Sequence, residues 1–155
     1  MTHYVVTTWF RVNTFHLHDS VALDTFFRDT WLGDQVFPSI VPAEHLRRLN
    51  VVLRCDMEDY EPKKRECTGR NLCIRPLRPA EVFNEHLGLV LKMRKLRGFR
   101  LHVMISASEL ERIEEILSAV RRVRARLMAA GVRVRFTWGG EELDGYLREL
   151  QRIRV

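Results

Sequence analysis

Four segments of the chain alternate apolar and polar residues with the period of a half-buried β-strand, and helical patterns separate them. The predicted strands are 15–18, 49–55, 99–105 and 132–138. The last is the clearest, since large apolar residues occupy one face while Arg133, Arg135 and Thr137 occupy the other. Strands buried on both faces would read as continuous apolar runs, so we expect helices to cover only one face of the sheet.

The segments between the strands carry apolar residues at helical spacing. The predicted helices are 20–31, 79–96, 107–130 and 141–151. The third is the strongest prediction, because Ser108 and Glu111 have the spacing of a capping box and Gly131 stands where the helix would end. Gly139 and Gly140 are interpreted as a turn from the last strand directly into the last helix.

The alternation of strands and helices predicts an α/β fold with a mainly parallel sheet and right-handed crossovers. One apolar residue of each predicted strand marks the spacing: Phe15, Leu49, Leu101 and Val134 are 34, 52 and 33 residues apart. Removing an insertion of about 20 residues from the middle unit leaves a period near 33, which is typical of a stacked, leucine-rich-repeat-like α/β repeat. The insertion is the charged segment 56–78. An open doubly wound sheet is the alternative.

The length of 155 residues suits one domain, 1–155, with a hydrophobic core of its own. No apolar run in the sequence approaches the roughly 20 residues that a membrane-spanning helix needs, so no membrane partner is expected. Cys55, Cys67 and Cys73 are an odd number of cysteines without zinc-ligand spacing. Reduced thiols in an intracellular protein are therefore the preferred interpretation.

The formal net charge of +6 is distributed unevenly along the chain. Residues 1–62 hold 5 basic and 9 acidic side chains, a net of −4, while residues 63–155 hold 21 and 11, a net of +10. Of the 26 basic residues 22 are arginine, the better bidentate partner for carboxylate and phosphate, although a coding bias toward arginine would produce the same count. Charge alone therefore favours an anionic partner without identifying it.

The segment Phe10-Arg11-Val12-Asn13-Thr14-Phe15-His16-Leu17 resembles a strand motif in a large group of uncharacterised fungal proteins with an F-box or F-box-like N-terminal segment. Its Asn-Thr-Phe step matches the motif, and Phe10 stands where those proteins usually have tyrosine. The similarity extends over about residues 4–55. The resemblance implies an α/β region that binds a substrate or a partner, and it does not imply a known catalyst.

No nucleotide-binding or catalytic motif is found in the sequence. Gly139 and Gly140 lack the spacing of a phosphate-binding loop, and no GxSxG elbow occurs. His16 and His18 share one strand face and could hold a metal ion with His102, but solvent-facing histidines are the commoner explanation. We therefore predict a protein that is not an enzyme and needs no cofactor.

Strand parity collects polar residues on the sheet face that points away from the helices. The predicted face comprises His16, His18, Asn50, Val52, Arg54, Arg100, His102, Met104, Arg133, Arg135 and Thr137. The predicted partner-binding residues are Arg54, Arg100, His102, Arg133 and Arg135. Arginine forks suit an acidic protein, whereas an uncovered sheet face must be polar in any case, and these two interpretations stand side by side. The leading hypothesis is a non-catalytic protein-interaction module.

A second basic set lies on the third predicted helix and supports nucleic-acid binding as the alternative function. It consists of Arg121, Arg122, Arg124 and Arg126. The aromatic residues fall in predicted core positions, which leaves no stacking platform for bases. A solvated helix face accounts for most of the set, so this hypothesis ranks second.

The first predicted strand begins abruptly, because residues 9–13 are interpreted as its beginning and no helix is predicted before it. Proteins usually pair or shield an uncovered sheet edge. The sequence therefore predicts a homodimer through this edge, or a partner that covers it.

Overall fold

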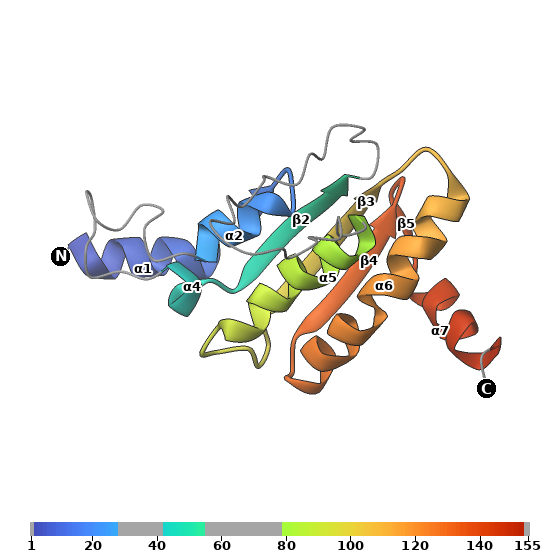
Figure 1. Ribbon diagram of the computed structural model, residues 1–155. Helices are drawn as coiled ribbons and strands as arrows, with labels where there is room; N and C mark the ends of the chain where they lie inside the picture. Colours follow the sequence, from blue (N-terminus) through green and yellow to red (C-terminus); the bar gives the residue numbers. More distant parts are fainter. Residues whose placement is uncertain (1, 28–41, 55–78, 154–155) are drawn as a thin grey trace, which may run out of the picture.

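The sheet has five strands in the order β1-β2-β3-β4-β5 (Figure 1). The computed structural model describes residues 2–27, 42–54 and 79–153. The strands are β1 (Phe15–Leu17), β2 (Arg48–Arg54), β3 (Arg100–Ser106), β4 (Arg133–Trp138) and β5 (Glu141–Glu142). Neighbours from β1 to β4 are parallel, and β5 is antiparallel to β4. The predicted α/β fold with a mainly parallel sheet is confirmed.

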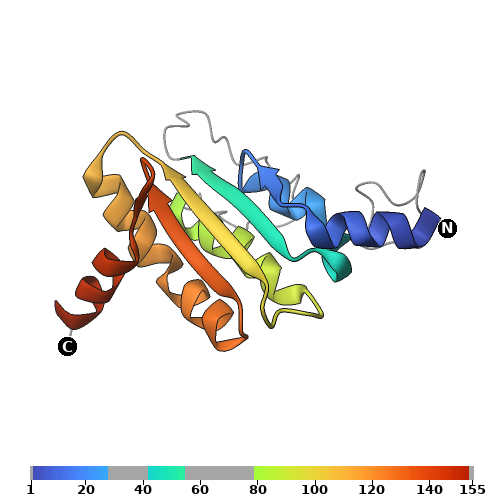
Figure 2. The ribbon, with the colours of Figure 1, turned by 180° about the vertical axis from the view of Figure 1, so that it is seen from behind.

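Three of the described helices form a single layer on the sheet. In chain order, all the described helices are α1 (Thr2–Val12), α2 (Val21–Phe27), α4 (Pro42–His45), α5 (Pro79–Gly88), the 3-10 helix η1 (Leu89–Lys92), α6 (Leu110–Ala129) and α7 (Asp144–Ile153). Helices α2, α5 and α6 cover one face, and the view from behind shows β2, β3 and β4 without a helix in front of them (Figures 1 and 2). Helices on one face were predicted, and this is confirmed.

The strand order explains the single layer. Each parallel strand lies beside the next one in the chain, so right-handed crossovers all fall on the same side of the sheet. A doubly wound sheet would instead carry helices on both faces, and the described residues do not form one. The leucine-rich-repeat-like interpretation stays a prediction, because only the strand spacing supports it.

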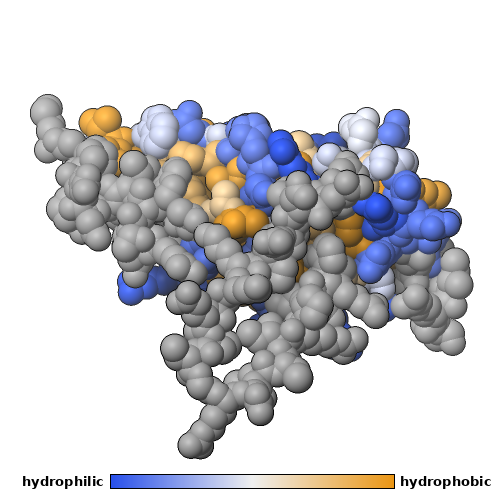
Figure 3. Space-filling view, turned by 45° about the horizontal axis from the view of Figure 1, so that its top comes forward, coloured by the Kyte–Doolittle hydropathy of each residue, from blue (hydrophilic) through white to orange (hydrophobic). Residues whose placement is uncertain are grey.

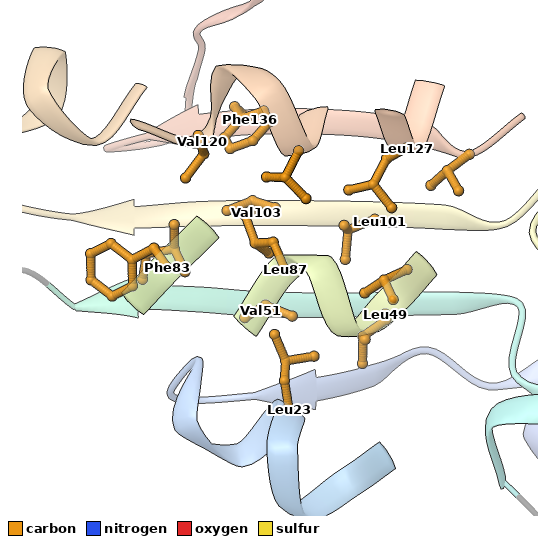
Figure 4. Packing of buried hydrophobic residues seen from close by; sticks show 14 of the residues in the cluster. Leu23, Leu49, Val51, Phe83, Leu87, Leu101, Val103, Val120, Leu127 and Phe136 are labelled. Carbon is orange, nitrogen blue, oxygen red and sulfur yellow. The ribbon is translucent and has the colours of Figure 1, made fainter. Parts of the chain in front are cut away.

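Apolar residues of the parallel strands form rows beneath the helices. One row runs Leu49, Leu101, Val134, and the next runs Val51, Val103, Phe136. Helix side chains that pack onto these rows include Leu23, Phe83, Leu87, Val120 and Leu127 (Figure 4). The strand faces predicted to be apolar are therefore the ones that meet the helices.

Helix α6 buries its predicted apolar stripe but begins later than predicted. The buried residues are Ile113, Ile116, Leu117, Val120, Val123 and Leu127. The capping-box prediction is wrong, because Glu109 occupies the N-cap position, without a side-chain cap bond, and Glu111 is the second helical residue. At the other end the Val132 amide donates to the Leu127 carbonyl and the Gly131 amide to the Met128 carbonyl, the two bonds of a Schellman motif.

We expect Gly131→Ala to lower the free energy of unfolding by at least about 1–2 kcal/mol, because the φ of +87° at this position disfavours a side chain. A β-carbon at Gly131 would also lie 3.2 Å from the backbone Cα of Arg97. Gly88 provides a matched control, since it has right-handed helical angles and open space around it. Gly88→Ala should add about 0.5–1 kcal/mol of stability. Urea denaturation measures both, and equal effects would contradict the expectation.

A helix precedes the first strand, which corrects the prediction that residues 9–13 begin that strand. Helix α1 continues to Val12, and the Asn13 amide still donates to the Trp9 carbonyl at 3.1 Å. The segment is rich in β-branched and aromatic residues, which favour strands. The burial of Phe10 and Thr7 against the rest of the protein outweighs that preference.

The last strand ends in a hairpin, which corrects the interpretation of Gly139 and Gly140 as a strand-to-helix turn. The two glycines have φ of +56° and +89° and join β4 to β5, with Trp138 paired to Glu141. Positive φ at both loop positions is characteristic of a type I′ turn, the two-residue turn that suits the twist of a hairpin. Helix α7 therefore begins at Asp144 and not at residue 141.

The other helix predictions hold in part. The helix predicted over 79–96 changes to 3-10 geometry after Gly88 and ends at Lys92. Of the helix predicted over 20–31, the described part is Val21–Phe27, and the rest lies outside the described residues, as does the predicted insertion 56–78. Among the described helices none has the length and apolar character to cross a membrane.

Candidate functional site

The sheet face that none of the described helices covers is the candidate site, and we call it the open face (Figure 2). It comprises the residues of β1–β4 that alternate with the buried ones: His16, Arg48, Asn50, Val52, Arg54, Arg100, His102, Met104, Ser106, Arg133, Arg135 and Thr137. All five predicted partner-binding residues, Arg54, Arg100, His102, Arg133 and Arg135, lie on it. His18, also predicted for this face, is exposed just beyond the end of β1.

Three arginines lie side by side at the start of three neighbouring strands, and we call them the arginine row. Arg48 of β2 is in register with Arg100 of β3, which is in register with Arg133 of β4. All three are exposed, and none forms an ion pair with a described residue. Like charges opposite one another on neighbouring strands are destabilising. The row therefore concentrates positive charge at a cost to the fold.

Hydrogen bonds of the strand ladder hold the arginine row in place. The Arg100 amide donates to the Arg47 carbonyl at 2.9 Å, and the Arg133 amide donates to the Phe99 carbonyl at 2.7 Å. Arg48 was missed because the predicted strand began at Leu49. The signal was available, since Arg48 lies two residues before Asn50 and shares its strand parity.

The next row across the sheet is polar and internally paired. It runs His16, Asn50, His102, Arg135. The Asn50 side-chain amide lies 3.2 Å from Nδ1 of His16, and Nε2 of His102 lies 2.8 Å from Oγ1 of Thr137. These hydrogen bonds restrain the rings between the arginine row and the half-buried Val52 and Met104.

Arg135 differs from the arginine row because it has a carboxylate partner. Its guanidinium lies 2.6 Å from Oε1 of Glu142, which belongs to the unpredicted strand β5. The hairpin places Glu142 opposite Thr137, next to the polar row. Strand β5 therefore neutralises one predicted binding residue. The arginines of the open face that form no ion pair with a described residue are Arg48, Arg54, Arg100 and Arg133.

Burial lowers the pKa of His102 below its ordinary value of 6.5, and the nearby positive charge of Arg135 and the ring of His16 lower it further. The carboxylate of Glu142 acts in the opposite direction. The pKa of His86, between α5 and α2, is also lowered, mainly by burial, and its Nδ1 lies 3.1 Å from Oγ of Ser20. Both imidazoles are therefore neutral at pH 7.

We expect acidification to destabilise the protein through these two histidines. Below pH 6.5 the unfolded chain protonates both rings, while the folded protein resists until its lower pKa values are reached. The unfolded state then binds more protons, so stability falls as the pH falls through this window. Urea denaturation from about pH 7.5 to 5.5 measures the slope. The double variant His86→Gln/His102→Gln should have a shallower slope, and an unchanged slope would contradict the expectation.

The histidines do not assemble a metal site. Across the described ranges, no group of three or more His, Cys, Asp and Glu side chains could hold a metal ion. His16 is instead paired with Asn50, and His102 with Thr137. The metal hypothesis for His16, His18 and His102 therefore finds no support in the described residues.

The alternative basic set lies on α6, on the opposite side of the sheet from the open face (Figures 1 and 2). Arg121, Arg122 and Arg126 are exposed. Arg124 is not available to a ligand, because its side chain is only 11% exposed and its guanidinium lies 3.2 Å from Oδ1 of Asp144 in α7. The set therefore cannot combine with the open face into one surface.

Comparison with models of protein families, with curated proteins and with solved structures finds no match to this chain. The resemblance of its N-terminal part to the F-box-like fungal proteins stays a prediction. The geometry of the open face is therefore the basis for a functional proposal.

Proposed function

We propose that the protein is a non-catalytic interaction module whose open face binds an acidic surface of a partner protein. The observation that carries the proposal is a set of exposed arginines that form no ion pair with a described residue, on a sheet face that no described helix covers. They are Arg48, Arg54, Arg100 and Arg133. Paired charges would be neutralised within the fold, whereas unpaired guanidinium groups keep their hydrogen-bond donors for a carboxylate or another anion.

A protein partner suits this face better than nucleic acid does. The open face carries no Phe, Tyr or Trp side chain on which bases could stack. Phe15, Phe136 and Trp138 share the parity of the buried strand residues and contribute to the core side. The exposed arginines of α6 would have to reach around the sheet to act with the arginine row, so they do not extend the same surface. They are Arg121, Arg122 and Arg126.

Charge reversal of the face tests the proposal. The double variant Arg100→Glu/Arg133→Glu should bind a fluorescent peptide of alternating glutamate and glycine at least about tenfold more weakly than the wild type, because like charges then meet at the interface. Arg121→Glu/Arg122→Glu is the matched control, since it changes the net charge equally on the opposite side. Fluorescence anisotropy at fixed salt measures both affinities.

Two outcomes would contradict the proposal. Equal losses in both double variants would mean that only net charge matters. The nucleic-acid alternative would be favoured if the protein binds single-stranded RNA, if Arg121→Glu/Arg122→Glu abolishes that binding, and if Arg100→Glu/Arg133→Glu leaves it unchanged.

The predicted homodimer stays a prediction, although its premise of a strand without a preceding helix is wrong. Strand β1 is the first in the sheet order and pairs only with β2 in the described structure. Helix α1 beside it exposes Tyr4, Val5, Trp9 and Val12, and hydrophobic residues are visible at this end of the molecule (Figure 3). Light scattering measures the mass in solution, and a monomer would contradict the prediction.

A further inference from the structure

The arginine row suits an anion whose negative charge is concentrated in one small group. Neighbouring strands lie about 4.8 Å apart, so the three Cα atoms span only about 10 Å. Arg54 also lies on the open face and forms no ion pair with a described residue, but it is six residues along β2 from Arg48, which corresponds to about 20 Å. Arg135 is already paired with Glu142. The positive charge is therefore gathered at one end of the open face and not spread along it.

A phosphate group matches this arrangement better than a carboxylate does. A phosphorylated side chain carries a charge of about −1.5 to −2 and three strong acceptor oxygens. Arginine forks bind such oxygens bidentately, and three neighbouring forks exceed what the two oxygens of one carboxylate can accept. A dianion would also relieve the repulsion among Arg48, Arg100 and Arg133 more fully than a single negative charge.

We propose that the arginine row binds a phosphate group carried by a serine, threonine or tyrosine side chain of the partner protein. The inference rests on the proposed function and specifies the group that the partner presents. A nucleic acid would offer many phosphates in a line, which requires cations along the whole contact. The open face supplies three at one position, and this favours a single phosphorylated residue.

Three peptides of one acidic sequence test the inference, with phosphoserine, glutamate or serine at the central position. We expect the phosphoserine peptide to bind at least about tenfold more tightly than the glutamate peptide, since charge-assisted arginine–phosphate bonds are the stronger ones. Arg100→Gln should remove most of this difference, and Arg100→Lys should restore it only in part because lysine lacks the fork. Arg54→Gln is the control and should preserve the difference. All three variants change exposed side chains, and circular dichroism checks that they fold.

The possible outcomes separate the inference from the function on which it rests. Equal binding of the phosphoserine and glutamate peptides, lost in Arg100→Glu/Arg133→Glu, would overturn the phosphate site and leave the proposed function intact. No binding of any peptide would overturn both. Single-stranded RNA that binds more tightly than the phosphoserine peptide, and displaces it, would assign the row to nucleic acid and overturn the inference.

Discussion

Replacing Phe136 with alanine is expected to lower the free energy of unfolding by about 3–5 kcal/mol, the largest effect of any single change considered. The ring is 0% exposed, lies opposite Val103 on β3 and faces helix α6 (Figure 4). Truncation would remove its apolar contacts and leave a cavity between sheet and helix layer. Because small proteins have only about 5–15 kcal/mol of stability in total, urea denaturation will resolve the loss easily.

Two further variants show whether packing causes that loss. Phe136→Leu keeps most of the buried volume and should cost less than about 1.5 kcal/mol. Val134→Ala lies on the same face of the same strand but at a half-buried position, so its effect should also be smaller. A loss below about 1 kcal/mol in Phe136→Ala would contradict the assignment of this ring to a closely packed core.

Asp144→Ala is expected to destabilise the protein by about 2–3 kcal/mol, somewhat less than the removal of one partner from a fully buried ion pair. The side chain of Arg124 is 11% exposed and that of Asp144 is 30% exposed. Without the carboxylate, the guanidinium would lie nearly buried and unpaired, and its Nε already lacks a hydrogen-bond partner among the described residues. Thermal or urea unfolding measures the change.

Arg124→Met separates the charge from the packing in this pair. Methionine keeps an apolar stem of similar length between α6 and α7 without a charge to desolvate. The double variant Arg124→Met/Asp144→Ala should therefore recover much of the stability that Asp144→Ala loses. An equal loss in the single and the double variant would show that Asp144 acts alone, for example at the start of α7, and not through Arg124.

These two effects concern the helix side of the sheet, and the open face is subject to a different balance. A row of three like charges weakens the sheet that carries it. The Schellman motif at Gly131 and the buried rows beneath α6 lie at the same end of β3 and β4 and hold the strand starts in register. The packed core thus compensates for the repulsion among the three arginines.

Local patterns were sufficient to predict much of the fold. The period of two in 132–138 correctly assigns Phe136 to the core and Arg133 and Arg135 to the other side. The helical spacing of apolar residues in 107–130 is equally local, and it correctly predicts a helix there that is buried along one side. The prediction failed at α1, where a strand-like composition forms a helix, and at β5, where a glycine pair makes a hairpin and not a turn into a helix. In each case the local sequence permits both structures, and long-range packing selects one.

The sequence by itself determined which side of each strand every residue occupies, because side chains alternate at a period set by the backbone alone. It therefore placed all five predicted partner-binding residues on the open face. Only the tertiary structure decided which strands are neighbours and in which register, because hydrogen bonds between distant segments set both. That register places Arg48 beside Arg100 and Arg133 and brings Glu142 to Arg135. The register thus turns a generally basic face into one with three exposed arginines side by side at one end.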